Sequence, residues 1–183
     1  MPRCYHRRAL LFGLAASFGL AGCRQGASPK MNDQALAELR SRYILSAEPE
    51  GVEGVLDVQE GYEKPREVVM VGRIGGIKNP WTAGKAAFVM ADPVVMADAA
   101  AAEADEHECE DAGCKFCQSK KLDKMNEGLA VVRFVDERGD LVNIDARQLF
   151  EVKEQETVVV CGRAEVDGLG CLVVLADGLY VRR

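Results

Sequence analysis

From residue 66 onward, short runs of β-branched and other apolar residues alternate with turn-forming residues, and this pattern predicts β-strands. The expected strands are 67–74, 85–91, 130–135, 141–144, 157–166 and 171–176, with 179–181 completing the last one. Asp167 to Gly170 predicts a hairpin turn, and 145–150 predicts one or two helical turns. This order predicts a mainly β protein, a five- to six-stranded Greek-key barrel.

The residues before 66 predict a helix and a connector. Asn32 can cap a helix over 33–45, and four apolar residues fall roughly on one face of it: Leu36, Leu39, Tyr43 and Ile44. Residues 48–65 combine Pro, Gly and carboxylates, which indicates a connector with one short strand at 55–58. We therefore expect one N-terminal helix in front of the barrel.

The start of the chain has the pattern of an export signal. Three arginines precede an apolar run at 10–21, which is shorter than the ~20 residues of a transmembrane helix. The run ends in Leu-Ala-Gly-Cys at positions 20–23, which resembles the lipobox of bacterial lipoproteins. That resemblance implies cleavage before Cys23, diacylation of its sulfur, and a membrane as partner. The alternative is a buried N-terminal helix that happens to contain Cys23.

These features predict three parts. Residues 1–22 are a lipoprotein signal peptide, 23–64 are the lipidated tether, short helix and connector, and 65–183 are the barrel domain with an insertion at 92–128. We expect an exported, membrane-anchored protein that faces the periplasm or the cell exterior. Residues 6–11 also loosely resemble a twin-arginine signal. The route of export and the choice between inner and outer membrane stay open.

Four sequence segments in the barrel region resemble the OB-fold. They lie at 69–74, 88–92, 158–163 and 175–182, and the resemblance extends over about residues 50–183. The chain is similar to uncharacterised exported bacterial envelope proteins with an OB-like core, which implies a fold but no established activity. OB-folds often bind nucleic acids or sugars, an analogy at the level of the fold alone. A jelly-roll or sandwich fragment is the alternative fold.

The insertion carries a compact cluster of soft ligands. His107, Cys109, Cys114 and Cys117 fall within eleven residues, and the last two form a C-x-x-C pair. Zn²⁺ takes four such ligands tetrahedrally, and three Cys with one His is a common structural set. The cluster therefore predicts a metal site, with zinc as the expected cofactor.

Three other chemistries compete at the insertion. An exported protein meets an oxidising compartment, so Cys109 bridged to Cys114 or Cys117 is a disulfide alternative without metal. The C-x-x-C pair alone could be a redox dithiol or handle a metal such as copper. The spacing from Cys109 to Cys117 also matches three ligands of an iron–sulfur cluster. A bridge between Cys161 and Cys171 is not expected, because the hairpin places Cys161 opposite about Ala176.

Charge narrows the function classes. The chain of 183 residues has 23 basic and 29 acidic side chains, and removing residues 1–22 leaves 20 and 29, a net charge of −9. This balance argues against nucleic acid as the partner, which needs a basic surface. His107 is the only histidine after residue 22, which disfavours a Ser–His–acid triad. We predict no catalytic residue and leave the question of an enzyme open.

The connection between the first two barrel strands is the other candidate site. Trp81, the only tryptophan, lies there, where OB-folds often contact ligands, and Lys85 at the start of the next expected strand is a second candidate contact. The alternative is that Trp81 packs over the mouth of the barrel. The leading hypothesis is a lipid-anchored extracytoplasmic binding or scaffold module that contacts an envelope protein or a small ligand. A redox or metal-handling protein using Cys114 and Cys117, and a disulfide-stapled ligand-binding module, are the alternatives.

Overall fold

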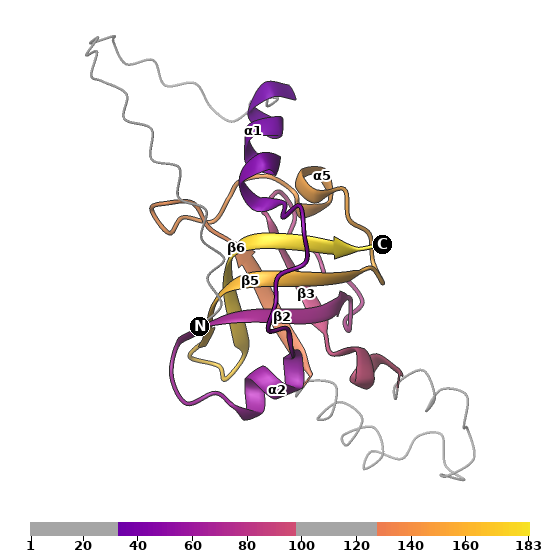
Figure 1. The fold of residues 1–183 in the computed structure, drawn as a ribbon, viewed down its shortest axis with the longest axis vertical. Helices are drawn as coiled ribbons and strands as arrows, with labels where there is room; N and C mark the ends of the chain where they lie inside the picture. Colours follow the sequence, from indigo (N-terminus) through magenta and orange to yellow (C-terminus); the bar gives the residue numbers. More distant parts are fainter. Residues whose placement is uncertain (1–32, 98–127) are drawn as a thin grey trace.

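The computed structural model describes residues 33–97 and 128–183. Within these ranges the chain is mainly β, with six strands in one sheet and few helices (Figure 1). The strands are β1 Glu53–Gly54, β2 Arg66–Ile74, β3 Ala87–Ala91, β4 Leu129–Phe134, β5 Thr157–Val166 and β6 Leu172–Arg182. The helices with defined bounds are α1 Asp33–Tyr43, α2 Val55–Glu60 and α5 Ala146–Phe150.

Five of the strands close into a barrel. The order is β2-β3-β4-β6-β5, and β5 pairs with β2 again to complete the ring. Four of the five neighbouring pairs are antiparallel, while β4 and β6 run parallel. The sixth strand, β1, adds to β2 outside the ring. The predicted mainly β class is confirmed as a closed mixed barrel of five strands plus one extra strand.

The barrel interior is filled by alternate side chains of each strand, as the period of two in a strand requires. Phe88 and Met90 of β3 point inward, as do Val132 and Phe134 of β4, and all four are fully buried. Phe134 also packs against Phe150 of α5, with ring centroids 4.4 Å apart and the ring planes tilted by 49°. The helix between β4 and β5 thus closes one end of the core.

The seam between β2 and β3 is the shortest in the ring. Only two residue pairs join these strands, whereas eight pairs join β2 to β5. Next to this seam β1 pairs with Met70 and Val71 of β2, and α2 follows directly. Val55 and Val58 of α2 are completely buried in the barrel core. The β1–α2 segment therefore fills the space that β2 and β3 leave where they diverge.

The short strand predicted at 55–58 is wrong, because these residues form α2. The Asp57 carboxylate accepts the backbone N–H of Gly54 at 3.0 Å and fixes the first turn of the helix. Val55 and Val58, three residues apart, then share the face that meets the core. Apolar residues at this spacing fit a helix as well as a strand when the run is so short.

A buried carboxylate ties α2 to the end of β3. Asp92 is 5% exposed, and its Oδ2 accepts the N–H of Leu56 at 3.2 Å while Oδ1 accepts that of Val94 at 2.9 Å. A Cβ atom on Gly54 would lie 2.9 Å from Oδ2, so the glycine makes room for this contact. The Asp92 N–H also donates to Gly128 O at 2.8 Å. Both ends of the predicted insertion are therefore fastened to the barrel beside α2.

The predicted N-terminal helix is confirmed, but it ends at Tyr43 rather than at residue 45. Ile44 forms a parallel bridge with Leu179, and the Leu45 N–H donates to Leu179 O at 2.7 Å. These contacts lie on the part of β6 that continues beyond its pairing with β4. Leu45 and Val52 then cover a small second cluster outside the barrel, formed by Val69, Val159 and Cys161.

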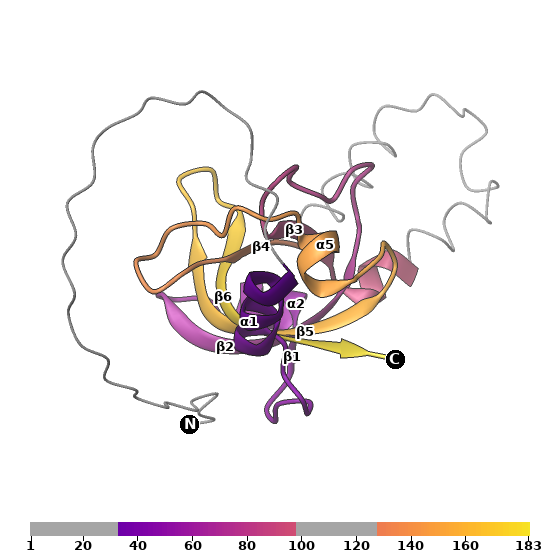
Figure 2. The same cartoon turned by 90° about the horizontal axis from the view of Figure 1, so that it is seen from above.

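Helix α1 is anchored to α5 at the end of the barrel opposite α2, and Figures 1 and 2 show α1 and α5 side by side. Arg40 of α1 donates to the carbonyl oxygens of Leu149 and Gln148 at 2.9 Å each. A cation at a helix C-terminus satisfies carbonyls that lack partners inside the helix. Arg40 also forms an ion pair with Glu151 at 2.8 Å.

Residues 141–144 differ from the predicted strand. Leu141 makes a single bridge to Val135, and the chain then turns so that Ile144 N–H donates to Val142 O at 3.0 Å. Val142 and Ile144 are both buried. The alternation of apolar and polar residues at 141–144 therefore reflects side chains that face the core, although the segment is not a strand. The predicted helical turn at 145–150 is confirmed as α5.

The hairpin of β5 and β6 contains a register shift between Cys161 and Gly162. Cys161 therefore lies opposite Gly178 rather than near Ala176, which pairs with Gly162. A Cβ on Gly162 would lie 2.7 Å from the Cα of Ala176 and still closer to the backbone oxygen of Leu175. The two strands approach so closely at this bulge that only glycine fits.

Replacing Gly162 by Ala should destabilise the protein by about 2–3 kcal/mol, because the clashing atoms belong to the backbone and cannot rotate away. Urea unfolding followed by circular dichroism measures this change. Gly168→Ala in the hairpin turn is the control, since a Cβ there meets nothing within 4 Å. Equal midpoints for the two variants would contradict the close approach of β5 and β6.

Candidate ligand-binding surface

Several predicted sites lie outside the described residues. Cys23 falls in 1–32, and the four predicted metal ligands fall in 98–127: His107, Cys109, Cys114 and Cys117. Among residues 33–97 and 128–183, no three His, Cys, Asp or Glu side chains are grouped so that they could hold a metal ion. No helix in the same two ranges has the length and apolar character needed to cross a membrane. The lipid and metal assignments stay predictions.

The two cysteines within the described ranges behave differently. Cys161 is buried in the small outer cluster, and Cys171 is exposed beside the hairpin turn. They form no disulfide with each other.

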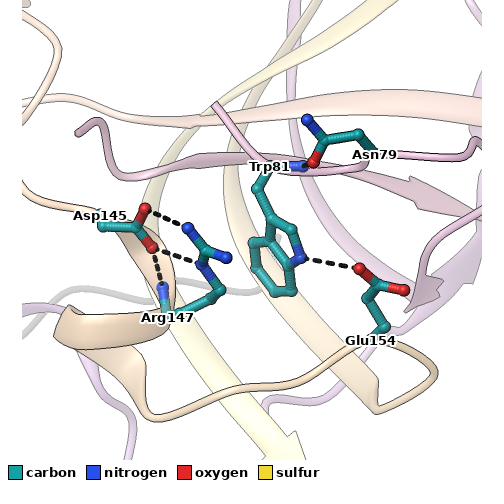
Figure 3. A network of polar contacts seen from close by, with 5 residues as sticks. All are labelled: Asn79, Trp81, Asp145, Arg147 and Glu154. Carbon is teal, nitrogen blue, oxygen red and sulfur yellow. Dashed lines mark hydrogen bonds and ion pairs between the residues drawn. The ribbon is translucent and has the colours of Figure 1, made fainter. Parts of the chain in front are cut away.

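Trp81 lies in the connection between β2 and β3, where it forms a bridge with Phe88. Its half-buried indole meets the Phe88 ring edge-on at a centroid distance of 6.1 Å, so its inner side belongs to the core cluster. The indole Nε1–H donates to Glu154 Oε1 at 3.2 Å, and the Trp81 N–H donates to Asn79 Oδ1 at 3.4 Å (Figure 3). Trp81 therefore packs on the barrel and keeps a polar edge.

Arg147 of α5 lies over the same indole. Its guanidinium carbon is 5.5 Å from the Trp81 ring centroid. Asp145 holds this guanidinium with two hydrogen bonds, at 2.8 Å from Nε and 2.7 Å from Nη2, and also accepts the Arg147 N–H as N-cap of α5. The hydrogen bonds from Arg147 hold the pKa of Asp145 below its usual range, and that of Arg147 is raised in return. The pair is therefore ionised and fixed in place at neutral pH.

We call these five residues the Trp81 platform: Asn79, Trp81, Asp145, Arg147 and Glu154. They come from two stretches far apart in the sequence, 79–81 and 145–154. Hydrogen bonds join Trp81 to Asn79 and Glu154, and Arg147 to Asp145 (Figure 3), while the guanidinium of Arg147 over the indole links the two groups. Arg147 is 54% exposed, so the stack faces solvent. The platform presents the edge of an aromatic ring beside a positively charged hydrogen-bond donor, Arg147, and two negatively charged acceptors, Asp145 and Glu154. Such a surface suits a neutral polar ligand better than a highly charged one.

Lys85 belongs to a different feature. Its Nζ donates to Asn143 Oδ1, and both residues line an open cleft of about 490 Å³ between α1 and residues 136–143. The two predicted ligand contacts therefore lie at different places, Trp81 on the platform and Lys85 in the cleft. The two features are neighbours, because the backbone of Lys85 accepts a hydrogen bond from Ala146 at the start of α5.

Of the five platform residues, the sequence predicts only Trp81 as a ligand contact. Asp145 before a predicted helical turn is an N-cap signal, and Arg147 two residues later is within its reach. Glu154, in contrast, is 73 residues from Trp81 along the chain and carries no local signal that would link them. Only the closure of the barrel brings these residues together.

Comparison with known proteins gives no relative. No protein-family model, no curated protein and no solved structure matches the chain. The strand pairing alone defines the barrel class.

Proposed function

We propose that the chain is a lipid-anchored extracytoplasmic binding module, built on an OB-fold, that binds a neutral glycan of the cell envelope. The observation that carries this proposal is the Trp81 platform, a half-buried tryptophan with Arg147 stacked on it and Glu154 bonded to its edge. Ligand contacts on a rigid barrel are preorganised, which lowers the entropy lost on binding.

The strand order supports the OB-fold. In the five-stranded ring the first strand pairs with the fourth, the third runs parallel to the fifth, and a short helix precedes the fourth strand. OB-folds are Greek-key barrels of five strands that bind oligosaccharides or oligonucleotides, often through the connection between their first two strands. Trp81 occupies that connection, and the net charge of −9 after residue 22 favours the sugar over the nucleic acid.

The lipobox at residues 20–23 supports the anchor. Nine residues separate Cys23 from Asp33, where α1 begins. At ~3.3 Å per extended residue, a tether of this length spans up to about 30 Å. A barrel tethered in this way reaches an envelope layer close to the membrane that holds its lipid.

Replacing Trp81 by Ala should weaken binding to purified cell-wall sacculi at least tenfold (about 1.4 kcal/mol), because the ligand loses its aromatic contact. Co-sedimentation of a chain that begins at residue 24 with the insoluble sacculi measures this binding. Such a chain keeps every described core residue, since the first of them is Tyr43.

Two further variants make that test decisive. Arg147→Gln keeps the indole in place and should also weaken binding, whereas Arg163→Gln on the exposed side of β5 should leave it unchanged. The proposal fails when the unaltered chain does not sediment with sacculi, or when all three variants sediment as it does.

The second part of the proposal concerns the insertion. We propose that His107, Cys109, Cys114 and Cys117 hold a structural Zn²⁺, since cysteine and histidine are ligands that zinc prefers. The hydrogen bond from Asp92 N–H to Gly128 O, at 2.8 Å, brings the two ends of the insertion together. The redox or metal-handling function and the disulfide staple are the alternatives that a measurement must separate.

A chain from residue 24, purified without added metal or reductant, should contain about one zinc per molecule by elemental analysis. Changing Cys114 and Cys117 together to Ser should remove it, whereas Cys171→Ser should not, since that exposed residue lies beside the hairpin turn. Bound copper or iron, or a thiol pair that oxidises and reduces reversibly, would favour the metal-handling or redox function instead. Absence of metal with two thiols missing would favour the staple.

A further inference from the structure

The cleft beside α1 is a candidate site that the proposed function does not use. The C-terminal half of α1 forms one wall with Arg42 and Tyr43, and the turn at 136–140 forms the other. Lys85 and Asn143, which are hydrogen-bonded to each other, also line it. Its volume of about 490 Å³ is large enough for a small molecule.

The walls of this cleft are held in shape by internal hydrogen bonds. The Tyr43 hydroxyl donates to Val135 O at 3.0 Å and joins α1 to the start of the turn. Asp136 Oδ1 accepts the N–H groups of Arg138 and Asp140 at 2.8 and 3.0 Å. The Asp136 N–H donates in turn to Asp140 O at 2.9 Å. The site is therefore preformed, and a ligand would not have to order it.

Charges of both signs face this cleft. Lys85 contributes an ammonium with three N–H donors, of which Asn143 accepts one. Arg42 contributes a guanidinium whose ion pair with Glu137 is long, at 3.4 Å, and exposed. Asp136 and Asp140 contribute carboxylates, and the backbone N–H groups that Asp136 accepts lower its pKa, which keeps it ionised.

This arrangement favours a ligand that carries one positive and one negative charge. A simple anion would be attracted by Lys85 and Arg42 but repelled by Asp136 and Asp140, and a simple cation would meet the reverse. A small molecule with an α-ammonium and an α-carboxylate can pair with both sets of charges. Leu39 and Leu141 add apolar surface to the lining, which fits an aliphatic side chain.

We propose that the α1 cleft binds the zwitterion of an aliphatic amino acid, with its carboxylate toward Lys85 and its ammonium toward Asp136 and Asp140. The cleft is open to solvent and its charges are only partly desolvated, so the expected dissociation constant is on the order of 1 mM. This inference does not rest on the Trp81 platform or on the envelope glycan.

Three probes that share the leucine side chain test the charge requirement: leucine, leucinamide and N-acetyl-leucine. At about pH 6.5 they are a zwitterion, a cation and an anion, since an α-amino group next to an amide titrates near ~7.8. Amide NMR spectra of the chain from residue 24 should show shifts at Tyr43, Asp140 and Asn143 on addition of leucine. The two singly charged probes should bind at least tenfold more weakly.

Matched variants complete the experiment. Lys85→Met and Asp140→Asn should each weaken leucine binding at least fivefold, whereas Lys78→Met in the same β2–β3 connection should not change it. Trp81→Ala should bind leucine as the unaltered chain does, which separates this site from the proposed glycan surface. Shifts of equal size with all three probes, or none in the cleft with leucine up to about 20 mM, would overturn the proposal.

Discussion

The barrel depends on how the gap between β2 and β3 is filled. These strands share only two residue pairs, so the ring is nearly open there. β1 pairs with Met70 and Val71 beside the gap, and α2 places Val55 and Val58 in the core. Each buried valine contributes roughly 1.5–3 kcal/mol, a large share of the ~5–15 kcal/mol that holds a domain folded. The segment before residue 65 is thus part of the barrel's core.

Aromatic side chains connect the core to α1, at the end of the barrel opposite α2. The chain leaves α1 at Tyr43, which is 1% exposed and packs edge-on against Phe134 with ring centroids 5.7 Å apart. Phe134 in turn contacts Phe88 and Phe150, and Phe88 supports the indole of Trp81. One row of aromatic rings therefore connects the wall of the α1 cleft, the core and the Trp81 platform.

The sequence predicted the barrel strands well because β-branched runs separated by turn residues have few other solutions. The strand prediction was wrong where β-branched residues are buried in another conformation. Val55 and Val58 at the gap are helical, and Val142 and Ile144 are buried without forming a strand. Trp81 was found because it is unique, but its link to Glu154 arises only from the closed ring. Pairing over long distances, such as β2 with β5, carries no local signal.

The most direct test of this account compares two chains, one beginning at residue 24 and one at residue 65, in urea unfolding followed by circular dichroism. The shorter chain keeps all five strands of the ring but loses β1, α2 and Tyr43. We expect a single cooperative transition for the longer chain and none for the shorter one. A shorter chain that unfolds cooperatively with the same midpoint would contradict the claim that the segment before residue 65 completes the barrel.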